Sequence, residues 1–590
     1  MLDWLIEGGT VVDGSGRPPA TADVGVQGGR IVEVGRITRA ARERVDAGGA
    51  WVTPGFVDIH THYDGQATWD ETFSPSIHHG VTTVVMGNCG VGFAPVRPGH
   101  EADLIKLMEG VEDIPGSALA EGMRWGWQSF PQFMDALDAM PHSLDFGVQI
   151  PHDPVRMAVM GERAFGQPVA SADDIAAMRA LVREALLAGA LGVSTGRTDN
   201  HRTAEGRETP AAEAGAAELT GIASAFGGLG RGVIQLVSDF DVLKGPERFD
   251  AEFDLVEQIA RAAGRPLSMT WLQRDPGGAQ WQAIRERVEA GVAAGLPLYL
   301  QTAARGIGVI VGLDASFHPF MGFPAFKEIA QLPLAARAAA MREPARKARV
   351  LAEKSDRVAG DGTAIPPLVD ILLARIELIS GRMFALGSTP DYEPGVKQSF
   401  LARARQRGMS ALEALYDHLA EGDGSNLIYF PIFNYNDGSL ETVRAMLEHP
   451  RALAGLSDAG AHVGTVCDAS FPTFMLTHWV RDRAQGRLPL ERAVEMLSAR
   501  NARYLGLGDR GQIAPGRRAD LNVIDPRRLR LCVPQLVRDL PAGGKRFLQT
   551  AEGYVGTWVA GQPVQREGAV TAARPGRLVR AAAPQRARQP

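Results

Sequence analysis

Residues 51–62 read "WVTPGFVDIHTH", an apolar, strand-like run that ends in two histidines, His60 and His62. In a β-strand, residues i and i+2 point to the same side, so both imidazoles would face the same way where the strand ends. Zinc accepts imidazole nitrogens at about 2.0–2.1 Å, and the pair therefore predicts metal ligands. Two unrelated polar residues at a strand end are the alternative, because so short a pattern arises readily by chance.

The composition excludes several functional classes. Of the 590 residues, 45% are apolar and 22% charged, as in an ordinary soluble globular protein. The net charge of -6 is slight for this length, so we expect neither a nucleic-acid partner nor a membrane partner. No apolar run reaches the ~20 residues of a membrane-spanning helix, and the N-terminal residues do not resemble a signal peptide. The cysteines, Cys89, Cys467 and Cys532, make no disulfide framework, so we expect a reducing, cytoplasmic setting.

Seven more short apolar runs follow the first one and alternate with stretches of helical period. They read "GVTTVVMG", "DFGVQIP", "ALGVSTG", "RGVIQLVSD", "PLSMTWLQ", "PLYLQTA" and "ALAGLSDAG". Strand–helix alternation with runs that are apolar on both faces predicts an α/β fold with a parallel sheet. About eight strands favour a closed (β/α)8 TIM-type barrel. An open doubly wound sheet is the runner-up, although no GxGxxG motif follows the first strand to suggest dinucleotide binding.

The two ends of the chain resemble each other. Residues 1–53 and 505–575 contain short alternating β-type runs with Gly-rich turns, and we expect them to form one small β-sandwich domain. The barrel would span 54–504. A segment of about 313–410 breaks the alternation and predicts a helical insertion late in the barrel. Residues 576–590 are poor in apolar residues and predict a disordered tail.

Other chemical groups follow later apolar runs. Cys89 ends "GVTTVVMGNCG" and, as a thiolate, would be a soft zinc ligand; a buried structural cysteine is the alternative. Asp458, in "GLSDAGAHVG", can be both a metal ligand and a general base for a water molecule. His462 lies four residues further on and either contacts the substrate or caps its loop.

Five motifs in order resemble the amidohydrolase superfamily, and within it the D-aminoacylase (N-acyl-D-amino-acid deacylase) group. They are "GGTVVDG", "VTPGFVDIHTHYD", "GVTTVVMGNCGVGFAPVRP", "GLSDAGAHVG" and "GQIAPGRRADLNVID". The resemblance implies a (β/α)8 barrel with a small β-sandwich, a metal site in the barrel and hydrolysis of an amide C–N bond. It also implies that His60, His62, Cys89 and Asp458 serve the metal.

The chain departs from that group at two middle strands. The group has a histidine at the end of each, which together with the cysteine holds the tighter zinc ion, but the corresponding runs "GVIQLVSDFD" and "PLSMTWLQRD" contain none. Cys89 with amide or hydroxyl oxygens would offer too few good donors for a closed zinc site. We therefore expect one zinc ion rather than two, held by His60, His62 and Asp458 with Cys89 nearby.

The expected mechanism is metal-assisted hydrolysis, with Asp458 taking a proton from water and giving it to the leaving nitrogen. A small-molecule substrate with a carboxylate would need an arginine clamp. Arg197 is the first candidate for this clamp, although it could instead form a surface salt bridge. Arg305 is the second candidate. His201 and His462 are further candidates for substrate contacts. For Glu112, in "MEGVEDIP", a solvated loop is the favoured interpretation.

Two other functions stay open at this point. The enzyme could hydrolyse another amide, a cyclic imide or an ester, since the missing histidines make a change of bond credible. Alternatively, a degenerate, non-catalytic barrel could serve binding. The chain retains His60, His62, Cys89 and Asp458. A barrel that had lost its catalytic function would not be expected to keep all four. The oligomeric state is left open, with a homo-oligomer as one outcome.

Overall fold

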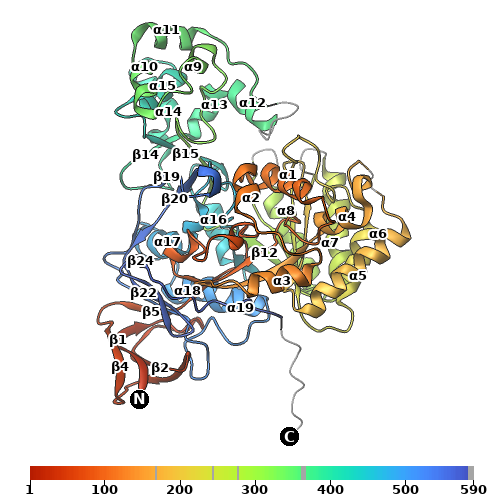
Figure 1. Cartoon of the computed structure of the whole chain (residues 1–590). Coiled ribbons are helices and arrows are strands. Elements are labelled where there is room, and N and C mark those ends of the chain that lie inside the picture. Colours follow the sequence, from red (N-terminus) through yellow and green to blue (C-terminus); the bar gives the residue numbers. More distant parts are fainter. Residues whose placement is uncertain (167–168, 242–244, 275–277, 360–366, 582–590) are drawn as a thin grey trace.

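The computed structural model describes the chain except for residues 167–168, 242–244, 275–277, 360–366 and 582–590. Figure 1 shows a central barrel, a β-sheet domain beside the N-terminus and a separate helical lobe at the top. Among the described residues, no helix is both long enough and apolar enough to cross a membrane.

Eight parallel strands form the barrel and follow one another in chain order around it. They are β6 (Phe56–Asp58), β7 (Val81–Met86), β8 (Asp145–Pro151), β9 (Gly192–Arg197), β10 (Val233–Ser238), β11 (Leu267–Thr270), β12 (Leu298–Thr302) and β16 (Ala452–Ala454). Each coincides with one of the eight apolar runs. Nearly every residue in them is buried, as expected where side chains fill the barrel on one face and contact helices on the other.

The barrel closes between its first and last strands through side chains. The amide of Asn501 donates to the carbonyls of Val57 and Ala454, at 2.8 and 2.7 Å. The hydroxyl of Ser457 donates to Asp58 at 2.5 Å. Closure identifies the fold as the predicted (β/α)8 barrel and rules out the open doubly wound sheet.

Helices cover the barrel and connect its strands (Figure 1). They are α1 (Glu101–Glu112), α2 (Gly116–Gly122), α3 (Phe130–Asp138), α4 (His152–Met160), α5 (Ala172–Ala188), α6 (Ala216–Ala223), α7 (Pro246–Ala263), α8 (Gln280–Ala293), α16 (Glu441–Glu448), α17 (Phe471–Phe474), α18 (Leu490–Glu495) and α19 (Asn501–Tyr504). Helix α5 shows how local sequence sets their limits. Ser171 and Asp174 form a capping box at its start, and Gly189 ends it in the left-handed conformation (φ 107°).

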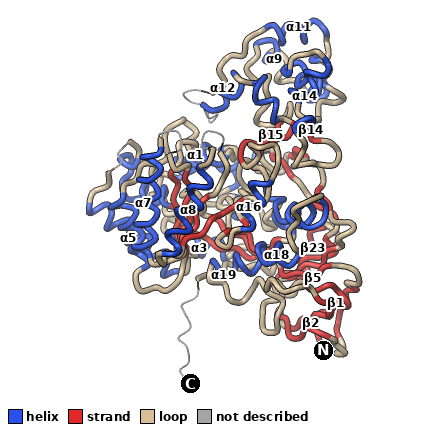
Figure 2. The backbone as a smooth tube through the Cα atoms, turned by 180° about the vertical axis from the view of Figure 1, so that it is seen from behind, coloured by secondary structure: helices blue, strands red, loops and turns tan. Residues whose placement is uncertain are grey.

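Strands from both ends of the chain share one sheet, as Figure 2 shows. Its members are β1 (Leu2–Val11), β2 (Ala20–Gln27), β3 (Arg30–Gly35), β4 (Ala41–Asp46), β5 (Trp51–Pro54), β17 (Leu521–Ile524), β22 (Tyr554–Val559), β23 (Gln562–Arg566) and β24 (Ala569–Val570). Strand β17 pairs with β5 and joins the two halves. Strand pairings connect all nine strands, and the sheet encloses a core that includes Trp4, Val52 and Trp558. Two short pairs accompany it, β18 (Arg530–Leu531) with β21 (Ala551–Glu552) and β19 (Gln535–Val537) with β20 (Arg546–Leu548).

The insertion is longer than the predicted 313–410. It has its own sheet, made of β13 (Ile307–Val311), β14 (Phe384–Leu386) and β15 (Leu427–Phe433). Its helices are α9 (Pro324–Lys327), α10 (Leu334–Met341), α11 (Pro344–Ala352), α12 (Pro367–Ala374), α13 (Ile376–Ile379), α14 (Phe400–Arg407) and α15 (Ala411–Ala420). The prediction fell short because β13 and β15 pair with each other in antiparallel fashion, outside the helical stretch that marked the insertion. A separate apolar core supports this lobe.

The predicted disordered tail is wrong in its first residues. Residues 576–581 lie along the start of β8, where Phe146 donates its amide to the carbonyl of Arg577 and accepts from the amide of Val579. The apolar side chain of Leu578 is buried there. The rest of that prediction, 582–590, lies outside the described residues. The domain boundaries at 53/54 and 504/505 stay predictions.

Candidate metal centre

His60 and His62 lie directly after β6, at the carboxyl end of the barrel, and both are buried. Their rings stand edge to face with centroids 5.4 Å apart. The Nε2 atoms face the same carboxylate oxygen, Asp458 Oδ1, at 3.2 Å from His60 and 3.9 Å from His62. The strand therefore directs both imidazoles toward one point, as the i, i+2 spacing predicts.

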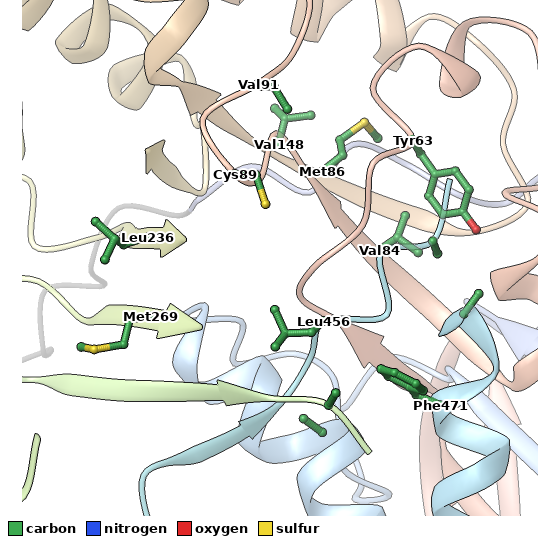
Figure 3. Packing of buried hydrophobic residues seen from close by; sticks show 14 of the residues in the cluster. Tyr63, Val84, Met86, Cys89, Val91, Val148, Leu236, Met269, Leu456 and Phe471 are labelled. Carbon is green, nitrogen blue, oxygen red and sulfur yellow. The ribbon is translucent and has the colours of Figure 1, made fainter. Parts of the chain in front are cut away.

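Cys89 reaches the same point from the loop after β7. Figure 3 shows it among the residues at the barrel centre, and its Sγ lies 3.3 Å from His60 Nε2. Its backbone has a positive φ of 57°, and its amide donates to Gln235 Oε1 of β10 at 2.8 Å. Burial, with the charges of Glu112 and Asp458, raises the pKa of the thiol well above its usual range. Only a cation close to the sulfur would favour a thiolate here.

The three side chains suit a metal ion. One ligand atom from each of His60, His62 and Cys89 lies within 4.8 Å of the others. Among the described atoms, neither ring nitrogen of His62 has a hydrogen-bond partner. Buried polar groups normally do, so the missing partner is consistent with a bound ion. Two imidazoles and a thiolate form a typical donor set for zinc.

Asp458 completes the site from the loop after β16. Its side chain is 19% exposed, whereas the two histidines are almost fully buried. Asp458 and His462 both have positive φ values, 46° and 48°. Residues held in this region are strained and occur preferentially at functional sites. The Asp458 carboxylate faces the histidines and stays partly accessible to water.

Gln301 of β12 fixes the orientation of His60, and the sequence analysis did not single it out. Its Oε1 lies 2.7 Å from His60 Nδ1. An amide oxygen can only accept, so Nδ1 carries the proton and Nε2 keeps its lone pair for a ligand. A lone glutamine inside an apolar barrel strand, "PLYLQTA", was the signal available in the sequence.

Glu112 is part of the site, and the expectation of a solvated loop is wrong. It is the last residue of α1 and only 2% exposed. Burial, with the charges of Asp458 and Asp64, raises the pKa of its carboxyl well above the usual range. Helical spacing could have revealed it: Glu112 falls four and eight residues after Met108 and Leu104, on the face that these apolar residues bury.

His201 and His462 lie close to the proposed ligands. Burial, together with the nearby His462 and His60, lowers the pKa of His201 to about 3. The side chain of His462 is 33% exposed, and its Nε2 lies 3.6 Å from Glu112 Oε2. Both histidines therefore stay near enough to the centre to be candidates for substrate contacts.

The two arginines that the sequence suggested as carboxylate clamps are engaged elsewhere. Arg197 forms a bidentate pair with Glu252 of α7, at 2.5 and 2.9 Å, because its side chain turns toward the helix layer. Arg305 is 1% exposed and pairs with Asp468 at 3.0 Å. Its guanidinium also stacks over Tyr392, 3.6 Å from the ring centroid. Neither guanidinium is available as a clamp in this arrangement.

A pocket opens beside Asp458. It is small, about 20 Å³, and is lined by residues 458–461, Val463 and 466–469, with Pro75, Arg546, Phe547 and Gln549. The pocket therefore gives room for water next to the exposed side of the Asp458 carboxylate.

Comparison with known proteins identifies the family. The amidohydrolase family model matches residues 43–565, which is most of the chain. The chain belongs to the amidohydrolase family. D-aminoacylase of Alcaligenes xylosoxydans xylosoxydans is 29% identical to this amidohydrolase over 582 residues, covering 98% of this chain and 97% of the relative. N-acyl-D-glutamate deacylase of the same organism is 30% identical over 532 residues, covering 89% and 87%.

A solved structure agrees with these relatives. It is the structure of a D-aminoacylase with a binuclear metal centre, for which activation by one metal and attenuation by the second metal are described. That structure is 26% identical to this amidohydrolase, with a TM-score of 0.64, and covers 98% of this chain and 100% of that chain. The protein is thus a metal-dependent hydrolase of carbon–nitrogen bonds other than peptide bonds, of deacylase-like type, which confirms the resemblance seen in the sequence.

Proposed function

We propose that this amidohydrolase is an N-acyl-D-amino-acid deacylase that works with one zinc ion. The observation that carries the proposal is the convergence of His60 Nε2, His62 Nε2 and Cys89 Sγ beside the Asp458 carboxylate. The acyl-D-amino-acid part rests on the relatives, which are D-aminoacylase and N-acyl-D-glutamate deacylase.

The donor set supports one ion rather than two. Strands β10 and β11 contain no histidine, and Gln235 of β10 already accepts the amide proton of Cys89. The solved relative described by one-metal activation and second-metal attenuation is consistent with catalysis by a single ion. His60, His62 and Asp458 would hold it, with Cys89 as a further soft donor.

The chain's own residues suggest the path of the proton. A bound zinc ion supplies the Lewis acidity that activates water and polarises an amide carbonyl. The carboxylate of Asp458, reachable from the pocket, takes the proton of the attacking water and returns it to the leaving nitrogen. His60 holds its proton on Nδ1 through Gln301 and so takes no part in this transfer. His201 and His462 stay candidates for contacts with the substrate carboxylate.

The metal content tests the number of ions. Protein purified without chelators should contain close to one zinc per chain by elemental analysis. Two tightly held equivalents would contradict the single-ion proposal, and a chain that binds no metal would favour the non-catalytic alternative. The proposed cytoplasmic location fits the three cysteines, all of which are free thiols in the structure.

A substrate panel tests the bond that is cleaved. N-acyl-D-amino acids should be hydrolysed well above N-acyl-L-amino acids, cyclic imides and esters. Preference for a cyclic imide or an ester would support the alternative hydrolase. Asp458→Asn, assayed with zinc in excess because the amide is a weaker ligand than the carboxylate, should lower kcat by at least about a hundredfold, the lower range for a lost acid–base group, while Tm stays close to that of the wild type. Retained activity in this variant would remove Asp458 from the proton-transfer role.

A further inference from the structure

The carboxylate of Glu112 lies between two histidines of the site. Its Oε1 is 3.2 Å from His62 Nδ1, and its Oε2 is 3.6 Å from His462 Nε2. His62 therefore presents Nε2 to Asp458 on one side and Nδ1 to Glu112 on the other. No arginine or lysine among the described residues pairs with Glu112.

This placement is unfavourable for the fold alone. Glu112 ends α1, where the negative end of the helix dipole repels a carboxylate. Within the described part of the chain, its Oε1 has no hydrogen-bond partner, because it faces His62 Nδ1 at hydrogen-bond distance without hydrogen-bond alignment. A buried carboxyl oxygen without a hydrogen-bond partner destabilises a protein. A stabilising role inside the folded chain therefore does not explain this residue.

His60 shows what a partner at Nδ1 achieves. Gln301 accepts its Nδ1 proton at 2.7 Å, which leaves Nε2 directed at Asp458 and Cys89. Glu112 stands in the equivalent place for His62. Histidines that bind metals generally donate their other ring N–H to a carboxylate or carbonyl, which fixes the ring and makes it a stronger ligand.

We propose that Glu112 is a positioning residue of the metal site, whose carboxylate accepts the Nδ1 proton of His62 and holds that ring for the ion. The proposal rests on the metal site of the proposed function, since an orienting acceptor has no purpose without a bound ion.

Glu112 also ties the helix end to the loop that carries Asp458. Its backbone carbonyl accepts the amide proton of His462. The next residue, Asp113, accepts from the hydroxyl of Thr465 at 3.2 Å. The α1 terminus is thus fastened to residues 458–465 by backbone and side chain, which keeps the carboxylate of Glu112 facing His62.

The test compares the metal-free and metal-loaded full-length protein. In Glu112→Leu, which removes the acceptor for His62 Nδ1, zinc affinity measured by chelator competition should fall about 10–100-fold. The Tm of the metal-free variant should equal or exceed that of the metal-free wild type, because leucine removes a buried oxygen that has no hydrogen-bond partner there. Co²⁺ substituted for zinc should give a visible spectrum that differs from that of the wild type. A purely structural role would instead lower the metal-free Tm and leave the affinity and spectrum unchanged.

Two further variants keep the interpretation clear. Glu109→Leu, on the same helix, is the matched control: the Glu109 carboxylate accepts from the Gly116 amide and not from the site, so zinc affinity should stay at the wild-type value. Glu112→Gln, whose amide oxygen can accept the Nδ1 proton as Gln301 does for His60, should keep most of the affinity. Unchanged zinc affinity in Glu112→Leu would overturn this inference alone. Failure of the wild type to bind zinc would overturn the proposed function together with it.

Discussion

At the scale of single residues, a chain of hydrogen bonds leads away from His60, and the donor and acceptor of each bond in it are fixed. The hydroxyl of Tyr504 donates to the carbonyl of Ile234, which can only accept. The hydroxyl of Ser268 therefore donates to Tyr504 and accepts from the Gln301 amide, at 2.7 and 2.9 Å. This leaves Gln301 Oε1 to accept from His60. The tautomer of a proposed ligand is thus determined by groups that cross the barrel interior.

Removing Gln301 should weaken the site more than removing distant members of this chain. Gln301→Leu leaves His60 Nδ1 without an acceptor, and zinc affinity should fall about 10–100-fold. Tyr504→Phe removes only the far end of the chain and should change affinity by less than the first variant. Isothermal titration with zinc measures both. Equal losses in the two variants would contradict an orienting role that acts through direct contact.

The residues that the sequence could identify are those whose position follows from one strand. His60, His62, Cys89 and Asp458 each follow an apolar run, so their meeting at one end of the barrel could be predicted. Glu112 could not be placed in this way, because it reaches the centre only when α1 folds back over His62. Arg197 also ends a strand, yet its side chain points to α7. Strand position alone does not show which face a terminal side chain takes.

At the scale of elements, strand β8 begins at a buried charge. Asp145 is 1% exposed and pairs with Arg510 at 2.6 Å and Arg518 at 2.9 Å. It also accepts from the backbone amide of Arg577, in the C-terminal segment that lies along β8. One carboxylate therefore joins the base of a barrel strand to three places in the last ninety residues of the chain.

Neutralising this carboxylate should destabilise the whole protein. Asp145→Asn leaves the buried Arg510 guanidinium with Asp509 as its remaining ion-pair partner among the described residues, beside the Thr83 hydroxyl, which should cost about 2–4 kcal/mol and lower Tm. Asp135→Asn is the matched control, because Asp135 pairs with Arg580 at the surface and exposed pairs contribute little. Thermal unfolding followed by circular dichroism measures both. A Tm equal to that of the control would show that the cluster does not anchor β8.

Elements were predictable where the apolar pattern was local. All eight barrel strands were found because each is a short, fully buried run between polar stretches. The limits of the insertion could not be predicted, because β13 and β15 lie more than a hundred residues apart and only their pairing identifies them as one sheet. The segment 576–581 has no local pattern of a strand or a helix, and backbone hydrogen bonds to β8, which is distant in sequence, order it.

At the scale of the whole molecule, the loop after Asp458 touches all three parts of the chain. The α1 terminus holds His462 from the barrel side. The insertion contacts the loop through the amides of Ile310 and Ser316, which donate to the carbonyls of Thr465 and Gly464 at 2.6 and 3.0 Å. In the C-terminal part, Phe547 donates to the carbonyl of Val463 at 2.6 Å. The loop that carries Asp458 thus takes its shape from segments that are distant in sequence.

A pair of substitutions can show whether the insertion positions Asp458. A Cβ at Gly464 would lie 1.9 Å from Ser316 Oγ and 3.0 Å from its Cβ, so Gly464→Ala should push the loop and the insertion apart. Misplacing a catalytic group by about 1 Å can cost a hundredfold in rate, and we expect kcat/KM to fall about 10–100-fold with zinc still bound. Ser316→Gly removes the obstructing atoms and alone should change little.

The double variant carries the argument. If the insertion acts on Asp458 through this contact, Gly464→Ala combined with Ser316→Gly should recover most of the lost kcat/KM, because the clash is gone while the backbone hydrogen bond from residue 316 remains. The two changes would then be strongly non-additive, as expected only for residues in contact. Additive losses would mean that Gly464→Ala acts within the loop itself, and that the insertion has no part in holding the carboxylate.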